Sequence, residues 1–200
     1  MKFARVLSGL LHPVIMPMYG LYIIFHSGSF LMLTPQVIKN FVYLIVFVST
    51  VLLPLSILPL LRFRKVISDY DISKSRERVV PLLFTGCFYF FGYYLLARLP
   101  LSSVIYLFLL SAVSAIAIVM LVSVKWKISL HMTGIGGVLG LTLGLAIRFS
   151  ASVRGFFMIV LLAAGLLAYS RLRLNVHSPA QVYCGLALGF LTVMIPILLY

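Results

Sequence analysis

Residues 130–147 read LHMTGIGGVLGLTLGLAI, a stretch without Lys, Arg, Asp or Glu. A helix needs about 20 mostly apolar residues to cross the hydrocarbon core of a membrane. Glycines recur every four residues in this stretch, at Gly136, Gly140 and Gly144, and small residues at such a spacing let membrane helices approach closely. The stretch therefore predicts a membrane-spanning helix that packs against another helix.

Six further apolar stretches predict additional spans, so the chain is expected to cross the membrane about seven times. They cover residues 12–33, 38–61, 79–97, 101–124, 155–169 and 179–200. Pro13 and Pro17 favour a kinked or re-entrant first segment. The chain has no internal repeat and no long linker. Residues 1–200 are therefore expected to form one integral membrane domain, an all-α polytopic helical bundle.

The composition excludes most other classes of protein. Of the 200 residues, 63% are hydrophobic and only 10% are charged, whereas roughly a quarter of the residues of a soluble domain are charged. A chain this apolar could not cover itself in water, which rules out a soluble enzyme. Cys87 and Cys184 lie in apolar stretches, so we expect reduced, buried thiols and neither a disulfide nor a zinc site.

The few charges are strongly basic, with 16 Lys and Arg against 3 acids and a formal net charge of +13. Asp69, Asp71 and Glu77 are too few for an enzyme that holds Mg²⁺ on several carboxylates. We expect them to pair with the bases of their own loop. The excess of base favours an anionic partner, which for a membrane protein is a phospholipid surface or a phosphate-bearing substrate, and not nucleic acid.

Seven spans place twelve bases at one face of the membrane and four at the other. The twelve are Lys2, Arg5, Arg62, Arg64, Lys65, Lys74, Arg76, Arg78, Lys125, Lys127, Arg171 and Arg173, and the four are Lys39, Arg98, Arg148 and Arg154. The positive-inside rule places the twelve-base face in the cytoplasm. All three acids and the three polar segments described next also belong to that face.

The most distinctive segment joins the last two predicted spans. Ser178, Pro179 and Gln181 predict a helix start, with Ser178 as the N-cap and Gln181 closing a capping box. His177 then precedes a helix N-terminus, where free N–H groups favour an anion. Arg171 is a permanently charged group suited to phosphate. Together they could bind and attack a phosphoryl group. Alternatively, the arginine anchors the membrane interface and the histidine caps a helix.

Two other segments of the same face carry polar residues. Ser129 and His131 stand at the start of span 130–147, and a histidine can donate or accept a proton near neutral pH. Lys74 and Arg78 belong to a basic loop. Taken alone, these segments have an ordinary explanation, namely a hydrogen-bonded histidine at the interface and a solvated loop near the lipid surface.

Taken together, the three segments resemble the type 2 phosphatidic acid phosphatase (PAP2-like) family. The third motif of that family consists of Ser-Arg, five residues, His, three residues and Asp, usually followed by two glycines four residues apart. Ser170, Arg171 and His177 match its register, and Gly185 and Gly189 follow. This part of the resemblance is the most specific.

The other two motifs are matched in part. Ser129 and His131 match two of the four residues of Pro-Ser-Gly-His. Lys74, Arg78 and Pro81 form a distorted version of a motif with Lys followed by Arg-Pro. The resemblance covers residues 74–200, which would form a phosphatase-like core, and residues 1–73 would form the preceding spans.

The resemblance implies a reaction and a role for each matched residue. His177 is the expected nucleophile and His131 the expected proton donor to the leaving group. No metal or other cofactor is implied, and the substrate would be a lipid phosphate or isoprenoid diphosphate that is hydrolysed through a phosphohistidine. The residues expected to bind the substrate are Arg171, Lys74, Arg78, Ser129 and Gln181.

One position departs from the family, because Gln181 stands where the family has Asp after the nucleophile. A glutamine oxygen can accept a hydrogen bond from the imidazole but carries no charge. Three functions stay open: a phosphatase with slower turnover or with an acid from elsewhere, a degenerate relative that binds or carries anionic lipid, and a non-enzymatic membrane subunit. The expected location is the inner (plasma) membrane. The site is cytoplasmic by the charge count and periplasmic by analogy with bacterial members of the family.

Overall fold

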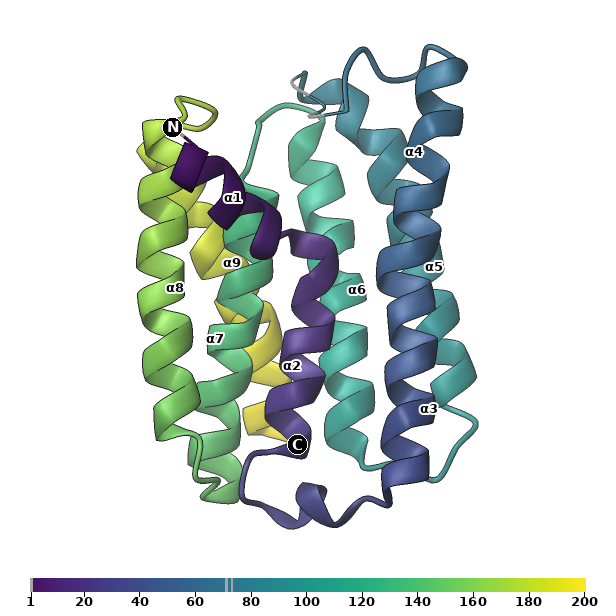
Figure 1. The fold of residues 1–200 in the computed structure, drawn as a ribbon, viewed down its shortest axis with the longest axis vertical. Helices are drawn as coiled ribbons and strands as arrows, with labels where there is room; N and C mark the ends of the chain where they lie inside the picture. Colours follow the sequence, from purple (N-terminus) through teal and green to yellow (C-terminus); the bar gives the residue numbers. More distant parts are fainter. Residues whose placement is uncertain (1, 71, 73) are drawn as a thin grey trace.

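The structure, a computed structural model, describes residues 2–70, 72 and 74–200 as an all-α helical bundle (Figure 1). Within these residues, seven helical segments are long and apolar enough to cross a membrane, which confirms the predicted class. The first span joins α1 (Lys2–Leu10), the 3₁₀ turn η1 (Pro13–Ile15) and α2 (Met16–Phe25), and the second joins α3 (Gln36–Phe47), the π-helical turn η3 (Val48–Leu52) and α4 (Leu53–Phe63). The third span joins the 3₁₀ turn η4 (Arg76–Arg78) and α5 (Val79–Leu96). The other four spans are single helices: α6 (Ser103–Ser123), α7 (Leu130–Phe149), α8 (Arg154–Arg173) and α9 (Pro179–Leu199).

The first span differs from its predicted limits. It covers Lys2–Phe25 instead of 12–33, because the residues before the long apolar run form the amphipathic helix α1, which packs against α8. The chain bends at His12, whose backbone is extended (φ −67°, ψ 137°), as is usual before a proline. Beyond α2, Gly28 adopts a φ of 71° and the short turn η2 (Phe30–Leu33) leads to the second span.

Helix α7 is the most deeply buried span, and its main partner is α9. Both helices start at the same end of the bundle and run side by side (Figure 1). A Cβ atom on Gly140 would lie 2.3 Å from the carbonyl oxygen of Phe190, and one on Gly189 would lie 1.9 Å from that of Thr133. No side chain fits at such distances, so the glycines permit the close approach. The predicted packing of a glycine-rich helix against another helix is therefore confirmed.

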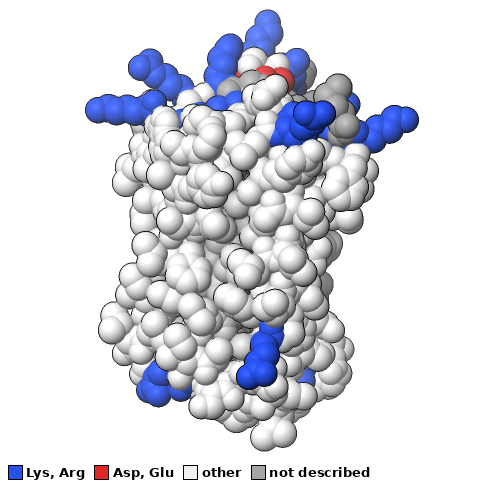
Figure 2. Space-filling model, turned by 90° about the vertical axis from the view of Figure 1, so that its left-hand side faces the viewer, with Lys and Arg blue, Asp and Glu red and all other residues white. Residues whose placement is uncertain are grey.

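The basic side chains lie at the two ends of the bundle. Figure 2 shows Lys and Arg at both ends and an uncharged middle on the visible face. The end that holds the N-terminus and the twelve bases is called the basic end below, and the end with the other four is called the opposite end. This distribution is the one that seven membrane crossings require.

The two cysteines are free, as expected, but the prediction that they are buried is wrong. Cys87 of α5 and Cys184 of α9 are both exposed on the outer surface of the bundle. A thiol behaves as a small apolar group. It is therefore as compatible with a helix face that turns toward lipid as with a protein core, and an apolar stretch of sequence does not distinguish the two.

Candidate functional site

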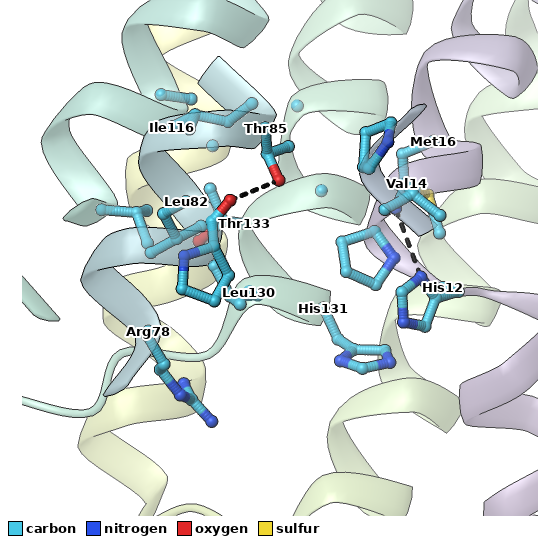
Figure 3. A pocket seen from close by; sticks show the side chains of 18 of the residues that line it. His12, Val14, Met16, Arg78, Leu82, Thr85, Ile116, Leu130, His131 and Thr133 are labelled. Carbon is cyan, nitrogen blue, oxygen red and sulfur yellow. Dashed lines mark hydrogen bonds between the residues drawn. The ribbon is translucent and has the colours of Figure 1, made fainter. Parts of the chain in front are cut away.

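A cavity of about 690 Å³ lies at the basic end and extends into the bundle. His131, Arg171 and His177, the three residues on which the enzymatic hypothesis depends, all line it. They come from α7, from α8 and from the loop that precedes α9. Arg78 and Lys127 add further positive charge to the wall, and Figure 3 shows Arg78 and His131 there.

The starts of α7 and α9 are joined through the backbone. The N–H of Ser129 donates to the carbonyl oxygen of Gln181 at 3.2 Å. The predicted capping box of α9 is present: the N–H of Gln181 donates to Ser178 Oγ at 3.4 Å, and the N–H of Ser178 donates to Gln181 Oε1 at 3.1 Å. Together with the glycine contacts deeper in the bundle, these bonds hold the two histidine-bearing helix starts next to each other.

His177 is 8% exposed, and its ring is oriented by two acceptors. Its Nδ1 lies 3.2 Å from the carbonyl oxygen of Lys127 and 3.2 Å from Oε1 of Gln181. The N–H of Ser178 donates to the same Oε1, which identifies this atom as the amide oxygen. Because both neighbours are acceptors, Nδ1 carries the proton and Nε2 carries the lone pair. An imidazole in this form is a nucleophile.

The surroundings of His177 keep its imidazole unprotonated at neutral pH. Burial, and after it the positive charges of Arg171 and Arg78, lower the pKa of His177 from 6.5 to about 4, although the hydrogen bond to Gln181 acts in the opposite direction. The lone pair on Nε2 is therefore available. The neutral Gln181 gives the imidazolium less support than a carboxylate would.

Arg78 and Arg171 are two of the arginines that line the same cavity. Arg78 is 5% exposed; its Nε donates to the carbonyl oxygen of Ile72 at 3.0 Å and its Nη1 to that of Ile128 at 3.1 Å. A guanidinium has five N–H groups, so these bonds fix the side chain and leave donors for an anion. Arg171 Nη1 donates to Ser8 Oγ at 3.4 Å. Guanidinium groups held in this way are suited to phosphoryl oxygens.

His131 is held by the first span. Its Nε2 lies 3.1 Å from the carbonyl oxygen of Ser8 and must donate, because a carbonyl only accepts. The nitrogen that remains for other partners is Nδ1. The ring of His12 meets that of His131 edge to face, with centroids 5.3 Å apart and an interplanar angle of 80°. Figure 3 shows the two rings next to each other on the cavity wall.

This contribution of the first span was not predicted from the sequence. Arg5, Ser8 and His12 all line the cavity. Residues three positions apart share one face of a helix, so the spacing of Arg5 and Ser8 is the signal that could have identified these two residues. His12 lies beyond the end of α1, at the bend, where helical spacing does not apply. Lys127, which also lines the cavity, was interpreted only as an interfacial base.

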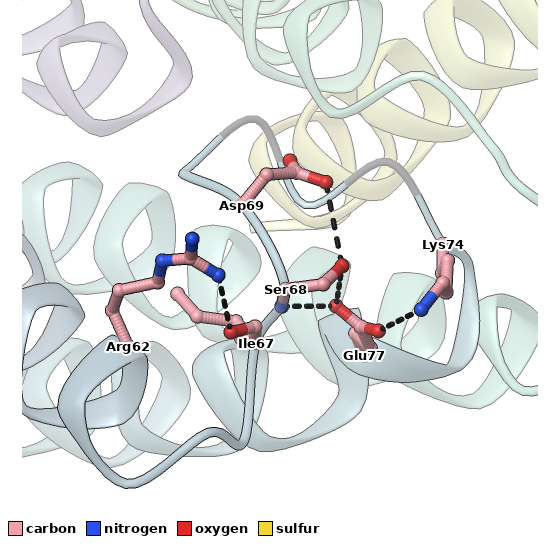
Figure 4. A network of polar contacts seen from close by, with 6 residues as sticks. All are labelled: Arg62, Ile67, Ser68, Asp69, Lys74 and Glu77. Atoms are coloured by element: carbon pink, nitrogen blue, oxygen red, sulfur yellow. Dashed lines mark hydrogen bonds and ion pairs between the residues drawn. The ribbon is translucent and has the colours of Figure 1, made fainter.

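Three residues that were expected to bind the substrate, Lys74, Ser129 and Gln181, do not line the cavity. Gln181 contacts Nδ1 of His177 instead. Lys74 is exposed and forms an ion pair with Glu77, with 3.0 Å between Nζ and Oε1 (Figure 4). Glu77 also accepts from the N–H and the Oγ of Ser68, at 2.6 and 2.7 Å, so these groups organise their own loop. Asp71, which was expected to pair there too, lies outside the described residues. Ser129 is fully buried, and its Oγ has no hydrogen-bond partner within the described part of the chain.

Beyond its polar rim the cavity is lined mostly by apolar side chains. Leu82, Tyr89 and Phe108 belong to this interior, and Figure 3 shows Leu82 and Ile116 inward of Arg78. Tyr89 lies eleven residues beyond Arg78 along α5, about 16 Å at the helical rise per residue and about half of the hydrocarbon thickness of a bilayer. A cationic rim above an apolar interior matches an amphiphile that has an anionic head.

Comparison of the chain with protein-family models, with curated proteins and with solved structures finds no match.

The site itself offers a defined set of chemical groups. The cavity wall contains three imidazoles, one of them the unprotonated ring of His177, and three guanidinium groups, from separate segments of the chain. Groups of these kinds can bind an anion, attack phosphorus and transfer a proton.

Proposed function

We propose that this protein is a metal-independent membrane phosphatase, a divergent relative of the type 2 phosphatidic acid phosphatases, that removes phosphate from a lipid phosphate or an isoprenoid diphosphate. The observation that carries the proposal is that His131, Arg171 and His177, taken from two different motifs of the sequence, line one cavity. The tautomer of His177 supports it further, because the two acceptors at Nδ1 leave the Nε2 lone pair free.

In the first step, Nε2 of His177 attacks phosphorus. An N–P bond forms and the P–O bond to the leaving group breaks. The leaving oxygen takes a proton from Nδ1 of a protonated His131, whose Nε2–H stays on the carbonyl oxygen of Ser8. Arg78 and Arg171 hold the phosphoryl oxygens, on which negative charge is spread in the transition state.

In the second step, a water molecule attacks the phosphohistidine. The N–P bond breaks, inorganic phosphate forms and the imidazole of His177 returns to its neutral state. The proton from the water passes to Nδ1 of His131, which restores the proton that was lost in the first step. Fixed cationic side chains supply the charge stabilisation in this scheme, which agrees with a chain that has only 3 acids.

The shape of the cavity supports a lipid substrate. A free sugar phosphate or inorganic ester would leave the apolar interior around Leu82 and Phe108 in contact with water, which is unfavourable. A hydrocarbon chain attached to the phosphate would fill it. The cavity volume of about 690 Å³ falls within the range of roughly 300 to 1,000 Å³ that proteins use for small ligands.

We place the site on the cytoplasmic face of the inner membrane. The cavity lies at the basic end, and without Lys74, Arg78 and Arg171 as functional residues the count is still nine bases against four. The positive-inside rule therefore favours the cytoplasm. A cysteine introduced at the exposed Lys125 should react with an impermeant reagent only in inside-out vesicles, and reaction in intact cells would contradict this placement.

The proposal is tested by phosphate release from lipid phosphates in detergent, with EDTA present. The wild-type protein should release phosphate and His177→Ala should not. His26→Ala is the matched control, because His26 lies at the opposite end and its Nδ1 is near the carbonyl oxygen of Tyr22; this variant should keep full activity. Release that depends on added metal, or that persists in His177→Ala, would contradict the mechanism.

A second function is favoured by one observation, the neutral Gln181 beside His177. Without a carboxylate the imidazolium is poorly supported, so the site would bind an anionic lipid without hydrolysing it. In that case the wild-type protein should release no phosphate but should bind lipid phosphate vesicles, and Arg171→Ala should lose this binding.

A further inference from the structure

The proposed reaction leaves one group of cavity residues without a role. Arg5, Ser8 and His12 line the cavity from the first span, outside the part of the chain that resembles a phosphatase. Ser8 contacts both His131 and Arg171, through its carbonyl oxygen and its hydroxyl group respectively. The first span is therefore built into the wall of the site and is not simply a membrane anchor.

His12 has the same kind of fixed ring as the two histidines already described. It is the N-cap residue of η1, and its Nδ1 accepts the N–H of Val14 at 3.5 Å, as Figure 3 shows. A ring nitrogen that accepts carries no proton, so the neutral ring of His12 carries its proton on Nε2. His12 consequently offers an N–H donor.

A phosphate bound in the cavity would need such an N–H donor in addition to those of His131. The Nε2–H of His131 is committed to the carbonyl oxygen of Ser8, and in the proposed reaction its Nδ1 serves the leaving oxygen, so His131 has no donor left for the other phosphate oxygens. A bound phosphate has several oxygen atoms, each with room for more than one donor. The ring of His12, with its centroid 5.3 Å from that of His131, stands next to the place where the leaving oxygen must meet His131.

We propose that His12 is a substrate-binding residue whose Nε2–H donates a hydrogen bond to an oxygen of the bound phosphate. This inference rests on the proposed function only in that the ligand is a phosphate, and it does not require turnover. The competing explanation is that His12 merely caps η1 through Nδ1. The two explanations assign the function of the residue to different ring nitrogens.

Two substitutions separate the ring nitrogens. In His12→Asn, the side-chain oxygen replaces Nδ1 and keeps the cap, since asparagine is a good N-cap residue, but no group stands at the position of Nε2. In His12→Gln, the amide nitrogen reaches the position of Nε2 and keeps the donor, while the cap is lost. His26→Asn, at the opposite end, is the control for the loss of an imidazole.

The experiment measures the binding of inorganic phosphate to the purified full-length protein by calorimetry at pH 7 with EDTA, together with the thermal midpoint of each variant. We expect His12→Asn to bind phosphate about tenfold more weakly, the usual effect of one lost hydrogen bond to a charged group. His12→Gln should stay within about threefold of wild type, and His26→Asn should bind as wild type does.

Each outcome of this binding experiment supports or contradicts the role of His12 as a donor to phosphate. If His12→Asn binds phosphate as tightly as wild type, or if His12→Gln is as weak as His12→Asn, the assignment of the donor is wrong. If the wild-type protein binds no phosphate, this inference and the proposed function both fail. If phosphate binding follows the expected pattern but lipid phosphate is not hydrolysed, the inference stands and the phosphatase proposal fails.

Discussion

The two ends of the bundle use their charged side chains in different ways. At the opposite end, two of the four bases contact groups close to their own positions: Lys39 Nζ donates to the carbonyl oxygen of Met32 at 2.8 Å, and Arg98 hydrogen-bonds and stacks on Tyr94, four residues away. At the basic end, by contrast, Ser8 is joined to residues 123 and 163 positions further along the chain.

This difference shows that a cluster of positive charges at one end of the bundle does not by itself identify a functional site. Bases at the opposite end contact rings and carbonyl groups, as interfacial anchors do. Bases and imidazoles at the basic end come from separate spans and line one cavity. A count of positive residues identifies the end that is richer in base, but the convergence of distant segments is what supports a site.

The sharpest test of the comparison removes one arginine from each end. Arg171→Met should lower kcat/KM for a lipid phosphate by about 10² to 10³-fold, because one fixed donor to the transition-state oxygens is lost. Arg148→Met, in which the lost side chain donates to the carbonyl oxygen of Tyr200 at the opposite end, should leave kcat/KM unchanged. Equal effects of the two substitutions would show that the arginines act only as membrane anchors.

A second pair of substitutions tests the helix contact that supports the site. Gly189→Ala introduces a methyl group 1.9 Å from the carbonyl oxygen of Thr133, and we expect this overpacking to destabilise the fold by about 1–3 kcal/mol and to reduce activity. Gly165→Ala is the matched control, because nothing lies within 4 Å of its added Cβ. Thermal unfolding in detergent measures both, and an unchanged midpoint for Gly189→Ala would contradict the close packing of α7 and α9.

The pH dependence of activity should reflect the lowered pKa of His177. Since that pKa is about 4 and not 6.5, kcat/KM should persist below pH 6 and fall only as the pH approaches 4, where protonation removes the lone pair. Because Arg171 contributes to the lowering, Arg171→Met should move this acidic limb to higher pH.

The lowered pKa of His177 also makes the free energy of unfolding depend on pH. Between pH 6.5 and about 4 the unfolded chain binds a proton at His177 that the folded protein does not bind, so this contribution to the free energy of unfolding decreases as the pH falls through that window. An acidic limb of kcat/KM near pH 6.5 would contradict the neutral state assigned to His177.

The smallest expected effect concerns Gln181. Gln181→Glu keeps the length of the side chain, and with it the capping box and the contact with His177 Nδ1, but adds a negative charge. The charge should raise the pKa of His177, stabilise the imidazolium and increase kcat several-fold. No change in kcat would mean that Gln181 is only a helix cap.

The sequence predicted the features that depend on local patterns. The spans follow from apolar length, the contact of α7 with α9 follows from glycine spacing, and the capping box of α9 follows from Ser178 and Gln181. These patterns also place the three polar segments at one end, which is why residues from different motifs could be expected to meet there.

The features that the sequence did not predict depend on contacts between distant segments. Nothing in the neighbourhood of Ser8 indicates that its carbonyl oxygen orients His131. Lys74 has the charge expected of a phosphate ligand, but an ion pair with Glu77 holds it outside the cavity. Cys87 is as apolar as a core residue, yet it turns to the outer surface.

The most direct test of the central claim is to trap the covalent intermediate. Wild-type protein mixed with a ³²P-labelled lipid phosphate and quenched within the first turnover should carry an acid-labile, alkali-stable phosphate, and peptide mapping should locate it at His177. The label should be absent from His177→Ala and present in His26→Ala. Phosphate release by the wild-type protein without label at His177, or label at another residue, would contradict nucleophilic attack by this imidazole.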